Sequence, residues 1–433
     1  MAKKSANASL HKAKVEKKDE FYTQFSDIEN ELKHYKNHFK NKVVYCNCDD
    51  PLASNFFKYF FLNFKYLGLK ELITTCYKSQ NFKEFSAEDS PKKAYAIKIT
   101  RDCKVDMIGN SSELLAEIEK LLSLSLSNSP NQSEETIEAF EKNKHKLKSK
   151  TTPLKADRTR NKGQSLLPIF EDKNLDNAGD FRSQDCIELL KQSDIVVTNP
   201  PFSLFREYVA QLVEYKKDFV IIGNKNAITY KEIFTLIKEN KLWVGYTPMS
   251  VDLLFNTSNE FQKEVLSGKK LGSGYKIIDG VVKLRSQSIW LTNLDHNKRH
   301  EILETLYSYD KMPEKYPKYD NYDAINVDKT IDIPMDYDGV MGVPITFLDI
   351  HNPKQFDIVA LGNSRDNFTP IKDYINPKKH LKNGSVVNGG AINCVLTLET
   401  DKLPLNQIYY TSENSKYLLP PYARILIRRK ESK

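Results

Sequence analysis

The residues of this sequence best suited to chemistry are four in a row, Asn199, Pro200, Pro201 and Phe202. They follow residues 195–198, a run rich in β-branched side chains that predicts a short buried strand. Proline cannot donate to a sheet ladder or continue a helix, so the backbone leaves this strand in a stiff shape. The strand end presents an amide oxygen, a carbonyl and an aromatic ring. Because ligands bind at the carboxyl ends of strands in open α/β sheets, we interpret the segment as a binding site.

These groups suit the exocyclic amino group of a nucleobase, which is a poor nucleophile because its lone pair is delocalised into the ring. The Asn199 side-chain oxygen and the Pro200 carbonyl can accept its N–H bonds, and Phe202 can stack on the base. No covalent intermediate is needed, so the remaining requirement is an electrophile held opposite. The alternative interpretation is a proline-stiffened strand exit without function, against which the flanking Asn and Phe argue.

Carboxylates stand beside other predicted strand ends. Asp49 and Asp50 lie in the turn after a strand predicted at 43–48, and Asp180 precedes a short predicted helix. The turn at 49–50 lacks the glycines of a dinucleotide site. S-adenosylmethionine fits these acceptors, because its sulfonium cation, ribose hydroxyls and adenine amine all favour them. Catalysis would then be mainly alignment of amine and methyl. The alternative is that Asp49 or Asp50 caps the next helix.

Strands and helices alternate around these residues. An apolar stripe predicts a helix over 25–39, begun by a capping box of Ser26 and Glu29. Strands are predicted at 43–48, 71–76, 94–100, 194–198 and 219–224. This alternation indicates an α/β fold with a doubly wound, mostly parallel sheet. Strands at 275–278 and 281–291 flank the turn Asp279-Gly280, and we expect them to end that sheet as an antiparallel hairpin. From about residue 300 weaker periodicity suggests a smaller mixed domain.

Composition is that of an ordinary globular protein, with 40% hydrophobic and 28% charged residues. No run approaches the roughly 18 apolar residues of a membrane span, and the amino terminus has no secretory signal pattern, so we expect a cytoplasmic protein. The cysteines are scattered, and Cys46 and Cys48 would lack further ligands, so we expect no metal.

The chain has a net charge of +8, and residues 142–162 form a basic run with nine Lys or Arg side chains and one acid, Asp157. Residues 1–19 are lysine-rich and predict a flexible arm, and about 104–170 looks like a basic insertion in the sheet domain. A nucleic-acid backbone is a reasonable target for the run, although a solvated flexible segment is the usual alternative. The proposed DNA-binding residues are Lys142, Lys144, Lys146, Lys148, Lys150, Arg158 and Arg160.

Six segments in order carry a family resemblance. They are Asp-Glu-Phe-Tyr-Thr at 19–23, the glycine-poor turn at 44–51, Gly-Asp-Phe at 179–181, Thr-Asn-Pro-Pro-Phe at 198–202, Ser-Ile-Trp-Leu-Thr-Asn-Leu at 288–294 and Met-Gly-Val-Pro-Ile-Thr-Phe at 341–347. Together they resemble the EcoRI-type adenine-specific DNA methyltransferases over most of the chain. Asn-Pro-Pro-Phe alone is shared with other amino-methyltransferases, whereas the whole series is far more specific.

The resemblance implies a class I methyltransferase fold. It implies methyl transfer from S-adenosylmethionine to the N6 of a flipped-out adenine in duplex DNA, with S-adenosylhomocysteine as product. Phe21, Tyr22 and Thr23 would border the cofactor's methionine end, and Asp180 and Phe181 its adenine. The full implied cofactor set is Phe21, Tyr22, Thr23, Cys48, Asp49, Asp50, Asp180, Phe181 and Asn199. The second strand ends in Thr74-Thr75-Cys76 without the ribose-binding acid of the wider methyltransferase pattern, so that contact stays open.

By the same resemblance, residues 20–299 would form the catalytic domain and 300–433 the target-recognition domain. We expect a monomer acting on nucleoid DNA of a bacterium, in a restriction-modification system with a separate endonuclease or in an epigenetic system without one. Two alternatives stay open. One is the same site acting on RNA adenine, cytosine N4 or a protein glutamine, and the other is a non-catalytic DNA-binding module on a methyltransferase fold.

Overall fold

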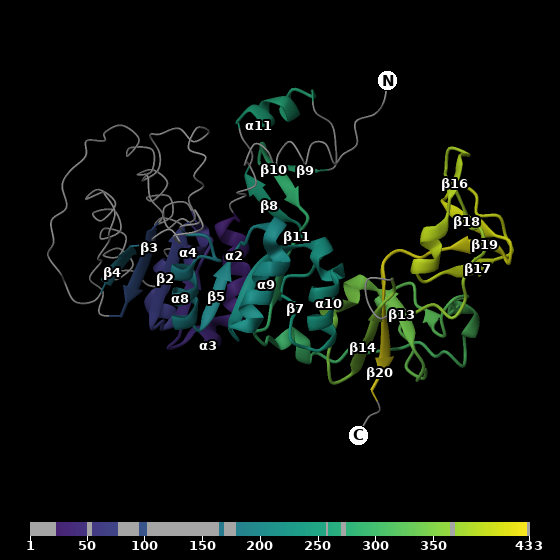
Figure 1. Cartoon of the computed structure of the whole chain (residues 1–433), viewed down its shortest axis with the longest axis horizontal. Helices are drawn as coiled ribbons and strands as arrows, with labels where there is room; N and C mark the ends of the chain where they lie inside the picture. The colour runs from purple at the N-terminus through teal and green to yellow at the C-terminus, as the bar shows by residue number, and fades with distance from the viewer. Residues whose placement is uncertain are drawn as a thin grey trace. The chain divides into compact units, whose positions relative to one another are not determined.

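The computed structural model describes residues 23–49, 54–76, 95–101, 164–168, 179–256, 259–269, 274–363 and 369–430. The expectations for the amino-terminal arm, Phe21, Tyr22, Asp50 and the basic run lie outside these residues. The chain forms two compact units (Figure 1). The first comprises residues 1–223 and 251–290, and the second comprises 224–250 and 291–433. The predicted catalytic domain, 20–299, and recognition domain, 300–433, are functional divisions of the chain, and they stay predictions.

Within the described residues the largest sheet has eight strands in the order β4-β3-β2-β1-β5-β6-β11-β7. Strands β2, β1, β5 and β6 pair in parallel, β3 and β4 continue the sheet antiparallel, and β11 pairs antiparallel with β7. The bounds are β1 Val43–Cys46, β2 Glu71–Cys76, β3 Tyr95–Thr100, β4 Gln164–Pro168, β5 Ile195–Thr198, β6 Asp218–Asn224, β7 Trp243–Val244 and β11 Ser288–Thr292. The predicted α/β architecture with a parallel sheet centre is confirmed.

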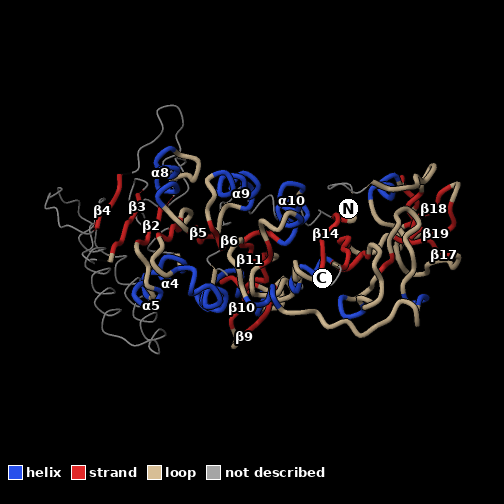
Figure 2. The backbone as a smooth tube through the Cα atoms, turned by 90° about the horizontal axis from the view of Figure 1, so that it is seen from below, coloured by secondary structure: helices blue, strands red, loops and turns tan. Residues whose placement is uncertain are grey.

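The parallel centre is covered on both faces. Helices α8 (Gln184–Gln192) and α9 (Phe205–Glu214) lie on one face, and α4 (Asn55–Leu62) and α5 (Phe64–Leu67) on the other (Figure 2). Every residue of β1 and β5 is buried, as expected for strands covered on both sides. The chain order turns between β1 and β5, because β2 flanks β1 and β6 flanks β5. The carboxyl ends of β1 and β5 therefore meet where such sheets bind ligands.

The predicted helix at 25–39 exists but is interrupted. It consists of α2 (Phe25–Leu32), a 3-10 turn η1 (Lys33–Tyr35) and α3 (Lys36–Phe39). The predicted apolar stripe is confirmed, since Ile28, Leu32, Tyr35 and Phe39 are buried. The predicted capping box is wrong: the helix begins at Phe25, its N-cap is Gln24, and no side chain caps it. Ser26 lies inside the first turn, too late in the chain to act as the cap.

The predicted hairpin forms with its turn, but its expected place on the large sheet is wrong. Strands β9 (Tyr275–Ile278) and β10 (Val281–Ser286) are antiparallel, and Asp279 and Gly280 both have positive φ, 50° and 77°. They join β8 (Leu253–Asn256) in a separate three-stranded sheet, order β8-β10-β9, and α11 (Asn259–Leu266) lies between β8 and β9 in the chain. The wholly buried β11 alone enters the large sheet.

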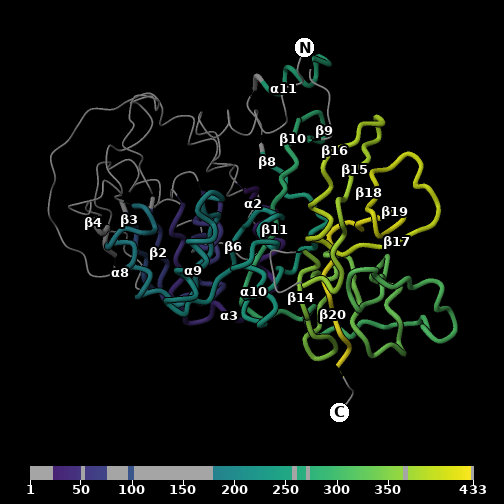
Figure 3. The backbone as a smooth tube through the Cα atoms, turned by 45° about the vertical axis from the view of Figure 1, so that its right-hand side comes forward, coloured from purple at the N-terminus to yellow at the C-terminus, as the bar shows by residue number. Residues whose placement is uncertain are grey.

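The second unit holds two further sheets. In the described residues it begins with η4 (Lys225–Thr229) and α10 (Lys231–Lys238). One sheet has the order β12-β13-β20-β14 and the other β16-β15-β18-β19-β17, the latter visible in Figure 3. Their bounds are β12 Ile325–Asn326, β13 Met341–Pro344, β14 Phe356–Leu361, β15 Lys378–His380, β16 Val386–Asn388, β17 Leu398–Thr400, β18 Tyr409–Ser412, β19 Ser415–Leu419 and β20 Arg424–Arg429.

Short 3-10 turns complete this unit. They are η5 Asn297–His300, η6 Pro313–Lys315, η7 Thr330–Asp332, η8 Ile345–Ile350 and η9 Gly390–Cys394, while η3 Phe202–Leu204 belongs to the first unit. In the part of the chain that the structure describes, no helix is long and apolar enough to cross a membrane.

Candidate active site

Asn199 and Asp49 follow two neighbouring parallel strands, β5 and β1. A hydrogen bond joins the two strand ends: Thr198 Oγ1 donates to Asp49 Oδ2 at 2.5 Å. The Asp49 amide also donates to the Thr75 carbonyl at 3.1 Å, which ties in the end of β2. The prediction that Asp49 and Asn199 share one edge of the sheet is confirmed.

The Asp49 carboxylate is built into the start of α4. Ser54 Oγ donates to Asp49 Oδ1 at 2.6 Å, and the same Ser54 oxygen accepts the backbone N–H groups of Phe56 and Phe57. Ser54 is therefore the helix N-cap, and the alternative that Asp49 caps the helix directly is wrong. Asp49 is only 7% exposed and stabilises the cap instead. The Ser54 hydroxyl couples the strand-end carboxylate to the helix.

Two buried threonines of β2 hold the turn after β1. Thr74 Oγ1 donates to the carbonyls of Cys46 and Asp49, at 3.1 and 2.8 Å, and Thr75 Oγ1 donates to the Asn47 carbonyl at 3.1 Å. In the wider methyltransferase pattern, the end of this strand carries a ribose-binding acid. The two threonine hydroxyls satisfy backbone carbonyls that a glycine-poor turn would otherwise bury without partners. A carboxylate could not donate these bonds.

The segment at Asp180 and Phe181 reaches the same turn through α9. The Phe181 ring packs edge-on against Tyr208, with centroids 5.0 Å apart, and Gln211 Nε2 donates to the Phe181 carbonyl at 3.1 Å. Tyr208 in turn donates its hydroxyl to Asn47 Oδ1. The structure thus gathers the residues predicted from three separate segments at one edge.

Sequence reasoning missed Arg182. Its guanidinium pairs with both carboxylate oxygens of Asp180, at 2.9 and 2.8 Å, and its backbone N–H donates to the same carboxylate at 2.9 Å. The guanidinium also lies 3.6 Å from Glu207 on α9. The only sequence signal was the spacing of Asp180 and Arg182, which is too common to stand out. Arg182 fixes the orientation of the carboxylate expected to meet the cofactor's adenine.

Cys48 sits among these carboxylates as a neutral thiol. Burial raises the pKa of Cys48 well above its usual range, and the charge of Asp49 and the neighbouring Cys186 raise this pKa further. A protonated thiol is a poor nucleophile. Cys48 therefore lines the turn without offering covalent catalysis. Among the described residues, no group of three or more His, Cys, Asp or Glu side chains is arranged to hold a metal ion.

The Asn-Pro-Pro-Phe segment is open on its outer side. Pro200 is buried, whereas Pro201 is exposed and Phe202 keeps 38% of its surface in solvent. An exposed aromatic ring beside a strand end can accept a stacked base. On the other flank, Thr23 is buried, its carbonyl accepts from Asn55 Nδ2 at 2.7 Å, and it bridges to Phe255. Thr23 thus lies beside the start of α4.

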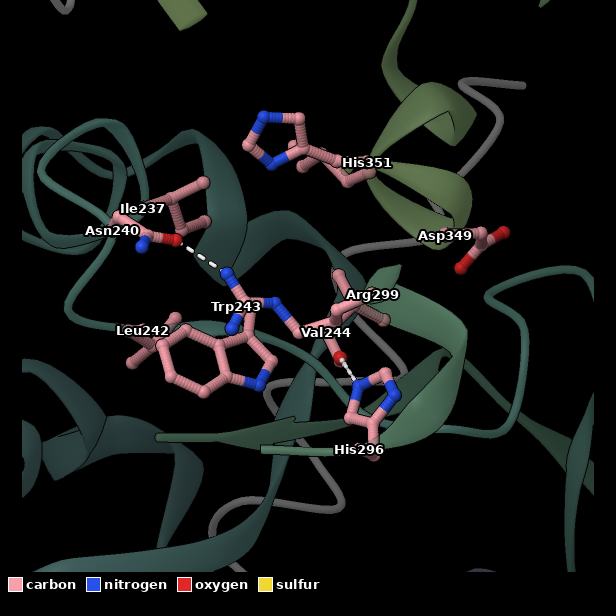
Figure 4. A pocket seen from close by; sticks show the side chains of 10 residues that line it. Ile237, Asn240, Leu242, Trp243, Val244, His296, Arg299, Asp349 and His351 are labelled. Carbon is pink, nitrogen blue, oxygen red and sulfur yellow. Dashed lines mark hydrogen bonds between the residues drawn. The ribbon is translucent and has the colours of Figure 1, made fainter. Parts of the chain in front are cut away.

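A cavity in the second unit contains none of the predicted site residues (Figure 4). The Arg299 guanidinium lies 3.5 Å from the Trp243 ring and donates to Asn240 Oδ1. His296 Nε2 lies 3.2 Å from the Val244 carbonyl. Burial lowers the pKa of His296 and of His351 to about 4, so both are neutral near pH 7. We interpret this cavity as part of the packing of its unit. Its lining residues are Ile237, Asn240, Leu242, Trp243, Val244, His296, Arg299, Leu348, Asp349 and His351.

The fold and the site together define an α/β protein in which neighbouring parallel strands end in a buried carboxylate and in an amide followed by a partly exposed aromatic ring. A family model described as "Adenine-specific methyltransferase EcoRI" matches residues 9–430. The chain belongs to this family of adenine-specific methyltransferases.

Three curated relatives are similar over most of their length. The chain is 43% identical to the Type II methyltransferase M.EcoRI of Escherichia coli over 84% of this chain and 93% of the relative. It is 34% identical to M.MpnI of Mycoplasma pneumoniae, over 86% and 91%, and 34% identical to M.MgeORF184P of Mycoplasma genitalium, over 81% and 85%. No solved structure matches the chain significantly.

Proposed function

We propose that this chain transfers the methyl group of S-adenosylmethionine to the N6 of an adenine flipped out of duplex DNA, leaving S-adenosylhomocysteine. The observation that carries the proposal is the hydrogen bond from Thr198 to Asp49, because it sets the base-binding segment beside the carboxylate turn. The relatives named Type II methyltransferases support DNA as the substrate. A parallel sheet centre with helices on both faces is what a class I methyltransferase fold requires.

The residues present fit a sulfonium cofactor. Buried carboxylates at Asp49 and Asp180 offer acceptors, and the turn between β1 and α4 has no glycine-rich phosphate loop. Phe21, Tyr22 and Thr23 would border the methionine end with Asp49 near it, and Cys48 and Asp50 would belong to the same cofactor set. Asp180 and Phe181 would hold the adenine end. When bound, the cofactor supplies an electrophilic methyl group.

The chain's own residues hold the amine. Asn199 Oδ1 and the Pro200 carbonyl would accept the adenine N6–H bonds, and Phe202 would stack on the base through its exposed face. Catalysis is then positioning of amine and methyl in line, with no bond between enzyme and base. The neutral Cys48 thiol is consistent with this, since no nucleophilic side chain is required.

DNA would be held outside the site. The lysines and arginines of 142–160 would bind phosphates without regard to sequence, and the domain at 300–433 would read the bases. We expect the enzyme to act on nucleoid DNA in the cytoplasm as a monomer, with a separate restriction endonuclease as its functional counterpart.

Label transfer tests the proposal. The protein is incubated with S-adenosylmethionine labelled in its methyl group and with duplex DNA, RNA or a protein mixture. We expect label only in DNA, as N6-methyladenine, and sequencing of DNA from a methylation-free host expressing the chain should place it at one recurrent site. Label confined to RNA or protein, or to cytosine N4, would contradict the proposal.

Neutralising Lys142, Lys144, Lys146, Lys148 and Lys150 to Gln tests the DNA-binding assignment. Binding should weaken alike for all sequences, and log affinity should depend less steeply on log salt, by roughly 0.9 for each phosphate that the variant no longer neutralises. Fluorescence anisotropy with specific and unrelated duplexes measures both quantities. A changed site preference would mean instead that the segment reads bases.

A further inference from the structure

The tip of the β9–β10 hairpin exposes three branched apolar side chains. Ile277 is 52% exposed, Ile278 41% and Val281 39%, and only the tight turn Asp279-Gly280 separates them. Singly exposed apolar residues are ordinary on a protein surface, but a contiguous group indicates an interaction. Neither the sheet edge nor the cavity described above uses this group.

The hairpin is a stiff support for that tip. Val282, beside the turn, is fully buried, and β10 pairs with β8 from Lys283 to Ser286. At the base, Asp252 takes ion pairs from Lys276 at 3.2 Å and Arg285 at 2.9 Å. Strand pairing and these ion pairs fix the base of the hairpin, and the three apolar side chains at its tip stay exposed to solvent.

The hairpin stands at the same sheet edge as the candidate active site. β10 continues through the single residue Gln287 into β11 of the large sheet, which lies below it in Figure 1. On the other side, Phe255 of β8 bridges to Thr23, and the Thr23 carbonyl is held by Asn55. Asn55 is the first residue of α4, directly after the Ser54 that binds Asp49.

We propose that this hairpin tip enters the base stack of duplex DNA next to the target adenine and fills the space that the flipped base leaves. The proposal rests on the proposed function. Removing a base from the stack costs a few kcal/mol, and proteins that open the stack insert Ile, Leu or Phe side chains as wedges. The hairpin carries Lys276, Lys283 and Arg285 against Asp279, and Asp252 at its base pairs with Lys276 and Arg285, so these five residues have a net charge of +1, which does not repel a duplex.

A wedge has a signature that a binding surface lacks. Its removal should slow methylation only where the target base must be pulled from a pair, because a mispaired base leaves the stack at lower cost. The double variant I277A/I278A and the single variant Val281→Ala remove the tip. Val213→Ala is the matched control, a valine also 39% exposed but near the far end of α9.

The measurement is single-turnover methylation of two duplexes, one with the target adenine paired to thymine and one with it opposite an abasic site. On the paired duplex we expect I277A/I278A to be slower than wild type by about tenfold or more, and Val281→Ala by a smaller factor. On the abasic duplex both should return to within about twofold of wild type. 2-Aminopurine at the target position should show less extrahelical base in I277A/I278A. Val213→Ala should match wild type on both duplexes.

Equal slowing on both duplexes, or no slowing on either, would overturn the wedge. A change of sedimentation from dimer to monomer in I277A/I278A would overturn it too, because the tip would then join copies of the chain. If wild type methylates no duplex, the proposed function fails and the wedge falls with it. If wild type methylates and I277A/I278A keeps its rate on the paired duplex, only the wedge fails.

Discussion

Two polar clusters of this protein differ in how completely they are closed. In the second unit, Arg299 lies over Trp243 and donates to Asn240, and His296 lies against the Val244 carbonyl. These groups bind one another around a cavity. At the edge of the large sheet the buried groups also bind one another, as Thr198 and Ser54 do with Asp49, but the cluster ends in a partly exposed Phe202.

The comparison separates stability from function. Polar side chains that bind one another inside a unit hold backbone segments together. The sheet edge has the same kind of buried support with an aromatic ring and two prolines on its outer side. Substitutions in the cavity should therefore change unfolding, whereas substitutions at the outer side of the edge should change methyl transfer.

The largest effect is expected at Asn199. Asn199→Ala removes an acceptor for the target amine, and loss of one such preorganised group costs about 10²–10³ in rate. We expect methyl transfer to fall by about that factor while the dissociation constant for S-adenosylmethionine, measured by calorimetry, changes by less than about threefold. Equal losses of cofactor binding and methyl-transfer rate would show instead that Asn199 has a structural role, like the residues around the cavity.

Acid should lower the stability of the protein through the two histidines that line the cavity. His296 and His351 have a pKa of about 4 in the folded protein, against an ordinary histidine pKa of 6.5. Between pH 6.5 and 4 these histidines are protonated in the unfolded chain but neutral in the folded chain. The free energy of unfolding therefore falls as the pH falls from 6.5 to 4, and these histidines do not affect it above pH 6.5. Burial raises the pKa of Asp349, which opposes this loss in part.

We expect a loss of roughly 2–3 kcal/mol between pH 7 and 5. Urea unfolding followed by tryptophan fluorescence measures it, and the double variant H296Q/H351Q should flatten the pH dependence. An unchanged pH dependence in H296Q/H351Q would show that these histidines are not the titrating groups.

The sequence predicted the sheet edge because its signals are local. β-branched runs marked β1, β2 and β5, and prolines marked the point where β5 ends. Parallel strands then bring their carboxyl ends to one edge whatever the intervening chain does. For that reason Asp49 and Asn199, which are far apart in the chain, could be placed together from the sequence alone.

The support of that edge could not be predicted in the same way. The bonds from Tyr208 to Asn47 and from Thr198 to Asp49 join residues 161 and 149 positions apart, and no local pattern marks them. The hairpin turn was predicted because Asp279-Gly280 is a residue pair that readily adopts positive φ, as both residues do in the structure. The pairing of β10 with β8 was not predicted. The cavity draws on residues from Ile237 to His351, so its closure depends on tertiary packing alone.

A matched asparagine tests the cavity. Asn240 accepts from Arg299 and has a positive φ of 55° at the end of α10. Asn240→Ala loses the bond and puts a strained residue there, so we expect the free energy of unfolding to fall by about 2 kcal/mol. Asn240→Gly loses only the bond and should be less destabilised. Methyl transfer below the unfolding temperature should stay within about twofold of wild type. If folded Asn240→Ala lost methyl-transfer rate as Asn199→Ala does, the claim that cavity residues affect stability and sheet-edge residues affect methyl transfer would be wrong.

The smallest effect is expected at the buried part of the sheet edge, where polar side chains bind one another as they do around the cavity. Thr198 is fully buried, and Thr198→Val keeps its shape but removes the donor to Asp49 Oδ2. A buried carboxylate oxygen that loses one donor should cost about 1–2 kcal/mol of unfolding free energy. Thr235→Val on α10 is the control, because its hydroxyl serves an exposed backbone carbonyl.

Because Asp49 also belongs to the proposed cofactor set, Thr198→Val should weaken S-adenosylmethionine binding by up to about tenfold, whereas Thr235→Val should change neither quantity. Denaturant unfolding and calorimetry measure both. Loss of stability without loss of cofactor affinity would make Asp49 a purely structural link between β1, β5 and α4. Asp49 would then have the same structural role as the cavity residues, and the proposed cofactor set would have to be drawn without it.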